Sequence, residues 1–426
     1  MQKVSDLTID NSKPTTFQFT HRPLPVRFLN LLGRALEHLG ISLVNLSEIS
    51  LLNAAHRQTG LYDWGDESFL VPMRILLESL KEETKLNFIG RYIFRQDTIV
   101  ILVNRLRIQD ELRHHPEILH EQIRRPLFII GLPRTGTTLL HNLLAQDSSS
   151  RVLLTWEMLF PCPPPERHTR EGDYRIAKAE RRLRQILYLA PNFNTIHPIN
   201  ANDPTECMFI LRYSFLCRGV FELVAPVTHY VEWLNTQDII PAYRYYRQLL
   251  QLLQWRCPGD HWVLKAPVHM FSLDALLTVF PDACVVQTHR DPLKVVPSCC
   301  SLFATFMGMY RDKLDMKRLG EECTNRLVDM IERGSRVRNS ANPSQFYDVH
   351  YKDLLKDPIS IVRQIYAYFG YKYSIQMEER MHRWVSENPQ HKHGIHRYSL
   401  EQFGLDPTLI NNRFAIYRKR FKISIE

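Results

Sequence analysis

The residues best suited to chemistry in this sequence lie between Gly131 and Thr138. Two glycines, Gly131 and Gly136, are separated by four residues and followed by two threonines, within the stretch LFIIGLPRTGTTLL. A glycine-rich loop between a strand and a helix points backbone N–H groups at an anion, and the helix dipole adds to the attraction. The spacing therefore predicts a loop that holds a phosphate group of a ligand.

The loop lacks a residue that triphosphate-binding loops use. In nucleotide hydrolases a lysine after the second glycine reaches the β- and γ-phosphates, whereas this sequence has a threonine there. An arginine lies inside the loop instead, and its guanidinium can bind a terminal oxyanion through two N–H groups. We expect a ligand with a 5′-phosphate and a different end group. The residues predicted to hold it are Arg134, Thr135, Gly136, Thr137 and Thr138.

The segment PRTGTT resembles the 5′-phosphosulfate loop of sulfotransferases, enzymes that use 3′-phosphoadenosine-5′-phosphosulfate (PAPS) as donor. The resemblance predicts an arginine at the end of a later strand and a serine eight residues on, both binding the 3′-phosphate. Arg290 and Ser298 match this pattern in VVQTHRDPLKVVPS. A 3′-phosphate is a dianion, which a guanidinium and a hydroxyl near a helix start suit well. Pro297 predicts that the following helix kinks or restarts there.

Three further residues are implied by the resemblance. Lys265 in WVLKAPVH lies 25 residues before Arg290, where cytosolic sulfotransferases have a lysine that contacts the sulfonate. Their catalytic histidine comes two residues after that lysine, but here the nearest histidine is His269, four residues on. Lys392 in HKHGIHRYS lies where these relatives have a basic loop over the 3′-phosphate.

A general base must take a proton from the acceptor. Glu157 is the first candidate, because some sulfotransferases use a glutamate that follows the loop helix, and His269 is the second. The choice between them stays open at this point. His141 and His197 are weaker candidates for the pocket.

The resemblance to the bacterial-type sulfotransferase family extends over nearly the whole chain. It includes NRLRIQDELRHHPE, HPINANDPTE, LKAPVH, HRDP and HRYSLEQFGL. It implies sulfonate transfer from PAPS to a hydroxyl or amine, with lysine and arginine in place of a metal. Two alternatives are a nucleotide-dependent kinase of the same fold and a nucleotide-binding protein without activity. A kinase would need a lysine at position 137, where this sequence has a threonine. A binding protein without activity would leave Lys265, Arg290 and Ser298 unexplained.

The elements that position these residues follow from hydrophobic patterning. Short apolar runs predict strands at 126–131, 261–264, 283–288 and 346–350. Helices are predicted near 23–39, 47–58, 67–83, 85–105, 137–146, 173–190, 241–256, 271–280, 352–370 and 375–387. Strands that alternate with helices indicate a P-loop-type parallel sheet flanked by helices. We expect a helical N-terminal region over 1–120 and a sulfotransferase domain over 121–426, with a mostly helical insertion at about 161–256.

Composition sets the remaining expectations. The 426 residues include 54 basic and 45 acidic side chains, a net charge of +9 that favours anionic ligands. The basic residues form no continuous tract of the kind that binds nucleic acid. The eight cysteines do not have the spacing of a metal site. With no signal peptide pattern or long apolar run, we expect a cytoplasmic protein without a membrane span. The first helix is expected to pack on the next domain, although contact with a membrane surface stays open. The acceptor is expected to be a small or lipid-like molecule, and no oligomeric state is predicted.

Overall fold

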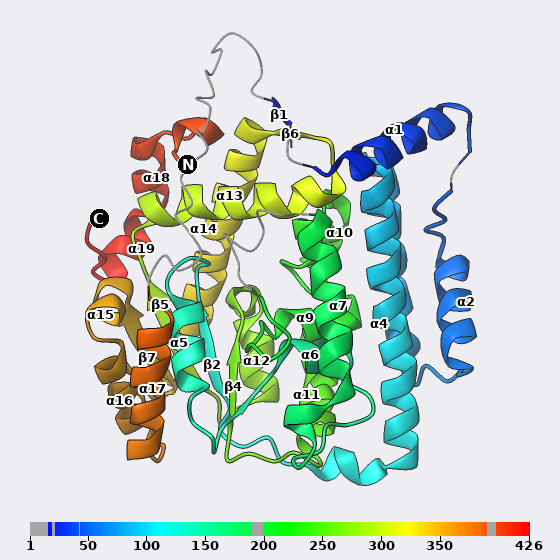
Figure 1. The fold of residues 1–426 in the computed structure, drawn as a ribbon. Coiled ribbons are helices and arrows are strands. Elements are labelled where there is room, and N and C mark those ends of the chain that lie inside the picture. The colour runs from blue at the N-terminus through cyan, green and yellow to red at the C-terminus, as the bar shows by residue number, and fades with distance from the viewer. Residues whose placement is uncertain (1–15, 19–21, 42, 190–198, 390–397) are drawn as a thin grey trace.

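Five parallel strands form the central sheet, in the order β3-β4-β2-β5-β7 (Figure 1). Their bounds are Leu127–Gly131 (β2), Arg151–Val152 (β3), Trp262–Lys265 (β4), Cys284–His289 (β5) and Phe346–His350 (β7). The first of them in the chain, β2, lies between β4 and β5. The order of strands therefore reverses beside the carboxyl end of β2, which is where open α/β sheets bind their ligands.

Four of these five strands were predicted from the sequence. The fifth, β3, has only two residues, too few to show any periodicity. A separate antiparallel pair joins β1 (Thr16–Gln18) to β6 (Lys313–Asp315), and neither strand was predicted. The computed structural model describes residues 16–18, 22–41, 43–189, 199–389 and 398–426.

Alternate residues of the strands face two apolar cores. Phe128 and Ile130 of β2 belong to the larger core, which also contains the N-terminal helices and the insertion. Leu127 and Ile129 belong to the smaller core on the other face. The larger core is thus continuous across residue 120, while the division into two domains stays a prediction.

The N-terminal region is helical, as its patterning predicts. Its helices are α1 (Leu24–His38), α2 (Glu48–Thr59), α3 (Leu70–Glu83) and α4 (Phe88–His114). α4 runs nine residues beyond the predicted end at 105. α1 lies across one end of α4 (Figure 1). The expectation that the apolar face of this helix packs on the next domain is wrong, because Phe28, Leu32 and Leu39 are 64%, 44% and 74% exposed.

The remaining α-helices surround the sheet and fill the insertion. They are α5 (Thr137–Leu144), α6 (Thr155–Leu159), α7 (Tyr174–Leu189), α9 (Met208–Leu211), α10 (Thr228–Leu234), α11 (Ile240–Gln254), α12 (Leu273–Val279), α13 (Pro292–Tyr310), α14 (Met316–Ser340), α15 (Tyr351–Lys356), α16 (Pro358–Phe369), α17 (Ile375–Glu387), α18 (Pro407–Arg413) and α19 (Ala415–Arg420). The single helix predicted at 352–370 is wrong. Pro358 starts a new helix there, and the Asp357 side chain caps it by accepting from Ser360 N at 3.0 Å.

Helix α13 is continuous through Pro297, so the predicted kink or restart is also wrong. Asp291 caps its first turn by accepting a hydrogen bond from Leu293 N at 2.9 Å, and the side chains of Val295 and Val296 are fully buried. This packing holds the helix together where the proline removes one backbone hydrogen bond. Among the described segments, α13 alone is long and apolar enough to cross a membrane, yet 67% of it is buried inside the protein, as in a core helix.

Candidate active site at the carboxyl end of the sheet

The glycine-rich loop adopts a backbone that an anion-binding turn requires. It leaves β2 at Gly131 with φ of +131° and enters α5 at Gly136 with φ of +89°, both in the region that favours glycine. A Cβ atom on Gly131 would lie 2.6 Å from the carbonyl oxygen of Thr288. No side chain caps the first turn of α5. Its N–H groups therefore suit a phosphate group as their partner.

The two anion-binding motifs meet in the folded chain. Arg134 Nε donates to Ser298 Oγ at 3.1 Å, and Arg290 Nη1 donates to the backbone oxygen of Arg134 at 3.0 Å. Arg290 also stacks on the ring of Tyr351 at 4.0 Å and donates to a Glu426 carboxylate oxygen at 3.2 Å. One continuous site thus contains the loop arginine, the strand-end arginine and the helix serine.

Lys265 ends β4 beside the same loop. Its ammonium Nζ is 3.5 Å from the exposed Thr138 hydroxyl and 2.5 Å from a carboxylate oxygen of Glu206. The Lys265 side chain is 2% exposed and that of Glu206 is 14% exposed. The carboxylate therefore lies at the edge of the phosphate loop and is partly exposed to solvent.

Glu206 is the site residue that the sequence analysis missed. Its segment folds onto the ends of two strands, where Thr205 N donates to Leu153 O at 2.9 Å and Cys207 N donates to Lys265 O at 3.0 Å. The segment HPINANDPTE, which Glu206 ends, contributed to the family resemblance. That resemblance was the signal that could have identified it, because the segment has no periodicity of its own.

Comparison with known proteins decides the family. Residues 126–374, more than half of the chain, match the model of the sulfotransferase family. The chain belongs to the sulfotransferase family. Its fold is the P-loop-type α/β fold of those enzymes, and the activity it supports is sulfonate transfer.

Three of the proteins similar to this sulfotransferase come from mycobacteria. The crystal structure of sulfotransferase STF9 from Mycobacterium avium is 30% identical, with a TM-score of 0.82 over 90% of this chain and 98% of that one. STF1 from Mycobacterium tuberculosis H37Rv is 32% identical, with a TM-score of 0.77 over 87% of this chain and 99% of that one. The omega-hydroxy-beta-dihydromenaquinone-9 sulfotransferase Stf3 of Mycobacterium bovis is 25% identical over 288 residues, 65% of this chain and 71% of Stf3.

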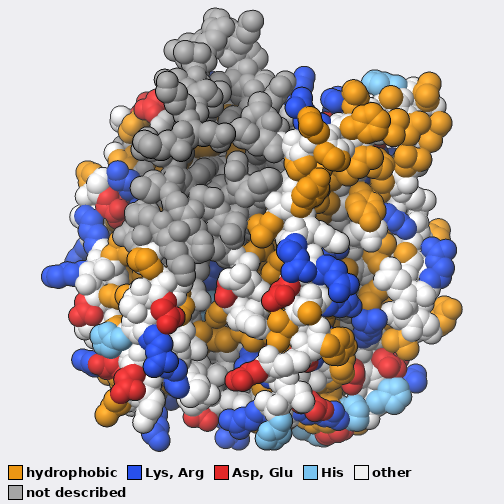
Figure 2. Space-filling model, viewed as in Figure 1, with side chains coloured by type: hydrophobic (Ala, Val, Ile, Leu, Met, Phe, Trp, Pro, Cys, Tyr) orange, Lys and Arg blue, Asp and Glu red, His pale blue; other side chains and the backbone are white. Residues whose placement is uncertain are grey.

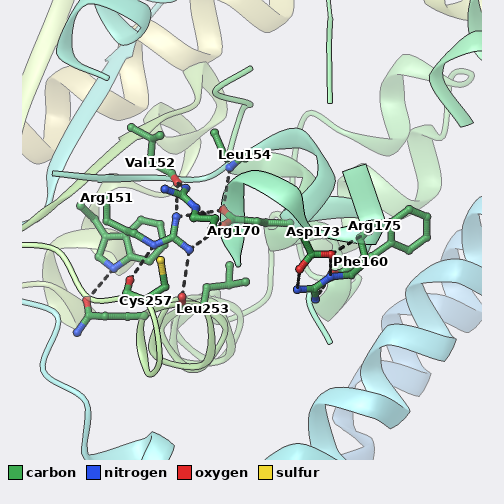
Figure 3. Close-up of polar contacts among 12 residues, drawn as sticks. Arg151, Val152, Leu154, Phe160, Arg170, Asp173, Arg175, Leu253 and Cys257 are labelled. Carbon is green, nitrogen blue, oxygen red and sulfur yellow. Dashed lines mark hydrogen bonds and ion pairs between the residues drawn. The ribbon is translucent and has the colours of Figure 1, made fainter. Parts of the chain in front are cut away.

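Glu157, the first candidate for the general base, lies in the interior of this sulfotransferase. Its side chain is 0% exposed and accepts from Arg151 at 2.8 Å and Arg170 at 2.9 Å. It also accepts from the backbone N–H of Leu154 at 3.1 Å. Figure 3 shows the two arginines converging on one point from separate segments. Because an acceptor cannot reach this carboxylate, the prediction that Glu157 is the base is wrong for this structure.

The electrostatics of Glu157 agree with a structural role. Burial alone raises the pKa of the Glu157 carboxyl, but the charges and hydrogen bonds of Arg151 and Arg170 outweigh burial and hold the pKa below its usual range. The carboxylate therefore stays ionised and fixes the start of α6.

His269, the second candidate, is also sealed. Its ring is 0% exposed, with Nδ1 2.8 Å from the Tyr243 hydroxyl and Nε2 3.0 Å from Cys207 Sγ. Burial lowers its pKa to about 3, and burial also lowers the pKa of His141 to about 3. The prediction that His269 is a base is wrong for the same reason of access. His197 and Lys392 lie outside the described residues.

The threonines of the loop are not equivalent. The Thr135 hydroxyl donates to Leu132 O at 2.6 Å, lies 2.5 Å from the Thr288 hydroxyl and is fully buried. Only its backbone N–H can serve a ligand, so the predicted contact of Thr135 with the ligand is limited to the backbone. Thr137 is also buried, whereas Thr138 is exposed beside Lys265. Within the described part of the chain, no three His, Cys, Asp or Glu side chains are grouped to hold a metal.

Proposed function

We propose that this sulfotransferase takes its sulfonate from PAPS and transfers it to a hydroxyl or amine of a small or lipid-like acceptor. The observation that carries the donor assignment is the pair of hydrogen bonds that joins Ser298 and Arg290 to Arg134 of the loop. A nucleotide with phosphate groups on both its 3′ and 5′ oxygens has charges at the two places where these side chains lie.

Each part of the site suits one part of the donor. Arg290 and Ser298 bind the 3′-phosphate, since the guanidinium already holds a carboxylate, that of Glu426, in the structure. The backbone N–H groups of 135–138 and the Thr138 hydroxyl bind the 5′-phosphate. Arg134 and Lys265 neutralise the sulfonate end. Lys392 stays a predicted contact of the 3′-phosphate.

Glu206 replaces Glu157 and His269 as the general base. It accepts the proton of the acceptor while the acceptor oxygen or nitrogen bonds to sulfur, and the bond from sulfur to the bridging oxygen breaks. Lys265, 2.5 Å from Glu206, stabilises the negative charge that develops on the leaving bisphosphate. The close pair therefore places proton acceptance and charge stabilisation at one side of the loop.

The relatives support a lipid-like acceptor. Stf3 of Mycobacterium bovis is named for an omega-hydroxylated dihydromenaquinone, a long apolar molecule with an alcohol end. The match spans 65% of this chain. We extend to this protein the class of acceptor, an apolar molecule with a hydroxyl, and not the individual compound.

Two measurements test the proposed function. Thermal unfolding with 3′,5′-bisphosphoadenosine is compared with unfolding in ATP plus magnesium, and the first should raise the midpoint more. Radiolabelled sulfonate from PAPS is then followed into a lipid extract, where an apolar product should gain the label. Stabilisation by ATP with magnesium alone would favour a kinase, and donor binding without label transfer would favour a nucleotide-binding protein without activity.

A further inference from the structure

Helix α1 shows its most apolar side to solvent. Leu24, Phe28 and Leu31 of α1 are spaced by four and three residues, so they lie on one face of the helix, and Leu39 directly follows its last residue. Their exposed fractions are 75%, 64%, 59% and 74%. Figure 2 shows hydrophobic side chains gathered at the upper right of the molecule, where Figure 1 places α1. A contiguous exposed patch of this kind marks an interaction surface.

The opposite face of α1 fixes this orientation. Val26, Asn30 and Gly33 are buried, and the Asn30 side-chain oxygen accepts from Ile89 N at 3.0 Å. A Cβ atom on Gly33 would lie 2.4 Å from Cβ of Phe88, so the backbone of α1 packs directly on the start of α4. If α1 were rotated to bury its leucines, their large side chains would lie against α4, where even the Cβ of an alanine has no room. The apolar face is therefore held outward by the packing of α1.

Basic side chains flank the apolar face. Arg27 and Arg34 are both exposed and lie seven residues apart, one turn on either side of Leu31. The one acidic residue of α1, Glu37, is bound to Arg91 at 2.7 Å. An apolar face with arginines at its edge is the pattern of a helix that lies in the interface of an anionic bilayer.

A groove beside α1 is lined by charged side chains of both signs. Its volume is about 1190 Å³, and Arg34 lies in its lining. Its lining includes Lys85, Arg311 and Lys313 beside Glu78 and Asp312. Arg91 is paired with Glu37 at 2.7 Å, and Arg34 lies 3.7 Å from Asp312. Lipid headgroups carry phosphate, which guanidinium and ammonium groups bind well.

The apolar face lies at the end of the molecule that holds the donor site. α13 carries Ser298 near its start, and the backbone oxygen of Tyr310 at its other end accepts from Asn87 N, just before α4, at 2.8 Å. Ser298 and Tyr310 are twelve residues apart in sequence, which corresponds to about 18 Å of helix. Figure 1 shows α13 and α1 at the same end of the protein.

We propose that the exposed face of α1 docks the protein on an anionic lipid bilayer. Leu24, Phe28, Leu31 and Leu39 enter the boundary between headgroups and acyl chains, and Arg27 and Arg34 contact anionic headgroups. The docked orientation presents the donor site to the membrane surface. That the acceptor is drawn from this bilayer rests on the proposed function, whereas docking itself does not.

Vesicle flotation of the full chain tests the docking. Wild-type protein should float with phosphatidylcholine vesicles that contain about one-third phosphatidylglycerol. The double variant Phe28→Asp/Leu31→Asp should bind them at least roughly tenfold more weakly, because it places charge in the apolar face. The matched control Ile375→Asp changes a side chain that is also 75% exposed, on α17, and should bind like wild type.

The role of Arg27 and Arg34 is tested by comparing binding to anionic and to neutral vesicles. Arg27→Gln/Arg34→Gln should lose about fivefold in affinity per arginine on anionic vesicles, and little on pure phosphatidylcholine. An equal loss on both kinds of vesicle would overturn the assigned role of the arginines.

Three results would overturn docking itself. One is wild-type protein that floats with neither kind of vesicle, and another is an Ile375→Asp variant that loses as much binding as the double variant. The third is a wild-type dimer that becomes monomeric in Phe28→Asp/Leu31→Asp without any vesicle binding, which would assign the face to a second copy of the chain. The thermal shift by 3′,5′-bisphosphoadenosine should be the same in the double variant and the wild type. That readout separates a failure of docking from a failure of the proposed function.

Discussion

Two carboxylates in this protein each bind basic side chains, and their surroundings give them different work. Glu157 is sealed in the core between Arg151 and Arg170, and all of its hydrogen bonds go to protein groups. Glu206 pairs with Lys265 at the edge of the phosphate loop and is 14% exposed. The comparison teaches that a paired carboxylate marks a reaction site only where a ligand can reach it.

Replacement of Glu206 should have the largest effect. Glu206→Gln keeps the size of the side chain but removes the proton acceptor, so turnover should fall about 10²- to 10⁴-fold. The free energy of unfolding should fall as well, because the ammonium of Lys265, 2% exposed, loses its charge partner, but by less than for a fully sealed pair, because Glu206 is 14% exposed. Steady-state kinetics at saturating PAPS and urea unfolding measure the two quantities. Activity within a few-fold of wild type would remove Glu206 from the reaction.

Replacement of Glu157 should affect the free energy of unfolding more than turnover. Glu157→Gln leaves two arginines without their charge partner in the core, which should lower the free energy of unfolding by about 3–5 kcal/mol. The exposed pair of Glu166 with Arg256, at 3.0 Å, offers a control. Glu166→Gln should cost about 0–1 kcal/mol. A Glu157→Gln protein that is as stable as wild type but has lost turnover would contradict the structural role of Glu157, since it would place the reaction at this carboxylate.

Ser298 tests the assignment of the nucleotide site. Ser298→Ala removes the hydroxyl that now accepts from Arg134, so affinity for 3′,5′-bisphosphoadenosine should fall about tenfold. Affinity for 5′-AMP, which lacks the 3′-phosphate, should be unchanged. Calorimetric titration of both nucleotides measures the difference. Equal losses for the two ligands would move Ser298 away from the 3′-phosphate.

The buried His269 should make the free energy of unfolding depend on pH. The pKa of His269 is lowered from 6.5 to about 3, so the unfolded chain binds a proton that the folded chain does not between these values. The free energy of unfolding should therefore fall as pH drops from about 6.5 towards 3, by up to about 1.4 kcal/mol per pH unit from this histidine. His269→Gln should reduce the slope, and His120→Gln, at an exposed position, should keep it. Urea unfolding at pH 7 and at lower pH measures the slopes, and equal slopes in wild type and His269→Gln would show that His269 titrates alike in both states.

Patterning predicted four of the five strands of the sheet and the approximate extents of about half of the described α-helices, but it did not predict α14, which has 25 residues. Buried runs of four or more residues, such as Cys284–His289, carry a clear signal, while the two residues of β3 carry none. The exposed face of α1 could not be predicted, because periodicity defines a face but not its neighbour. The cytoplasmic location stays a prediction.

The anion-binding residues were predicted because they lie in short motifs. Gly131 and Gly136 fix the backbone of the loop locally. Arg290 directly follows a strand, and Ser298 lies in the helix that comes next. The base was predicted wrongly because access depends on contacts across the chain. Arg170 covers Glu157 from 13 residues away, and Lys265 meets Glu206 from 59 residues away. Such pairings have no local sequence signature.

The central claim is that one nucleotide with phosphates at its 3′ and 5′ positions bridges the phosphate loop and Arg290. Calorimetric titration of 3′,5′-bisphosphoadenosine and 5′-AMP, each into wild type and Arg290→Gln, tests it most directly. Wild type should prefer the bisphosphate by about tenfold or more, and the preference should disappear in the variant. Equal affinity of wild type for the two nucleotides, or a preference that survives in Arg290→Gln, would contradict it.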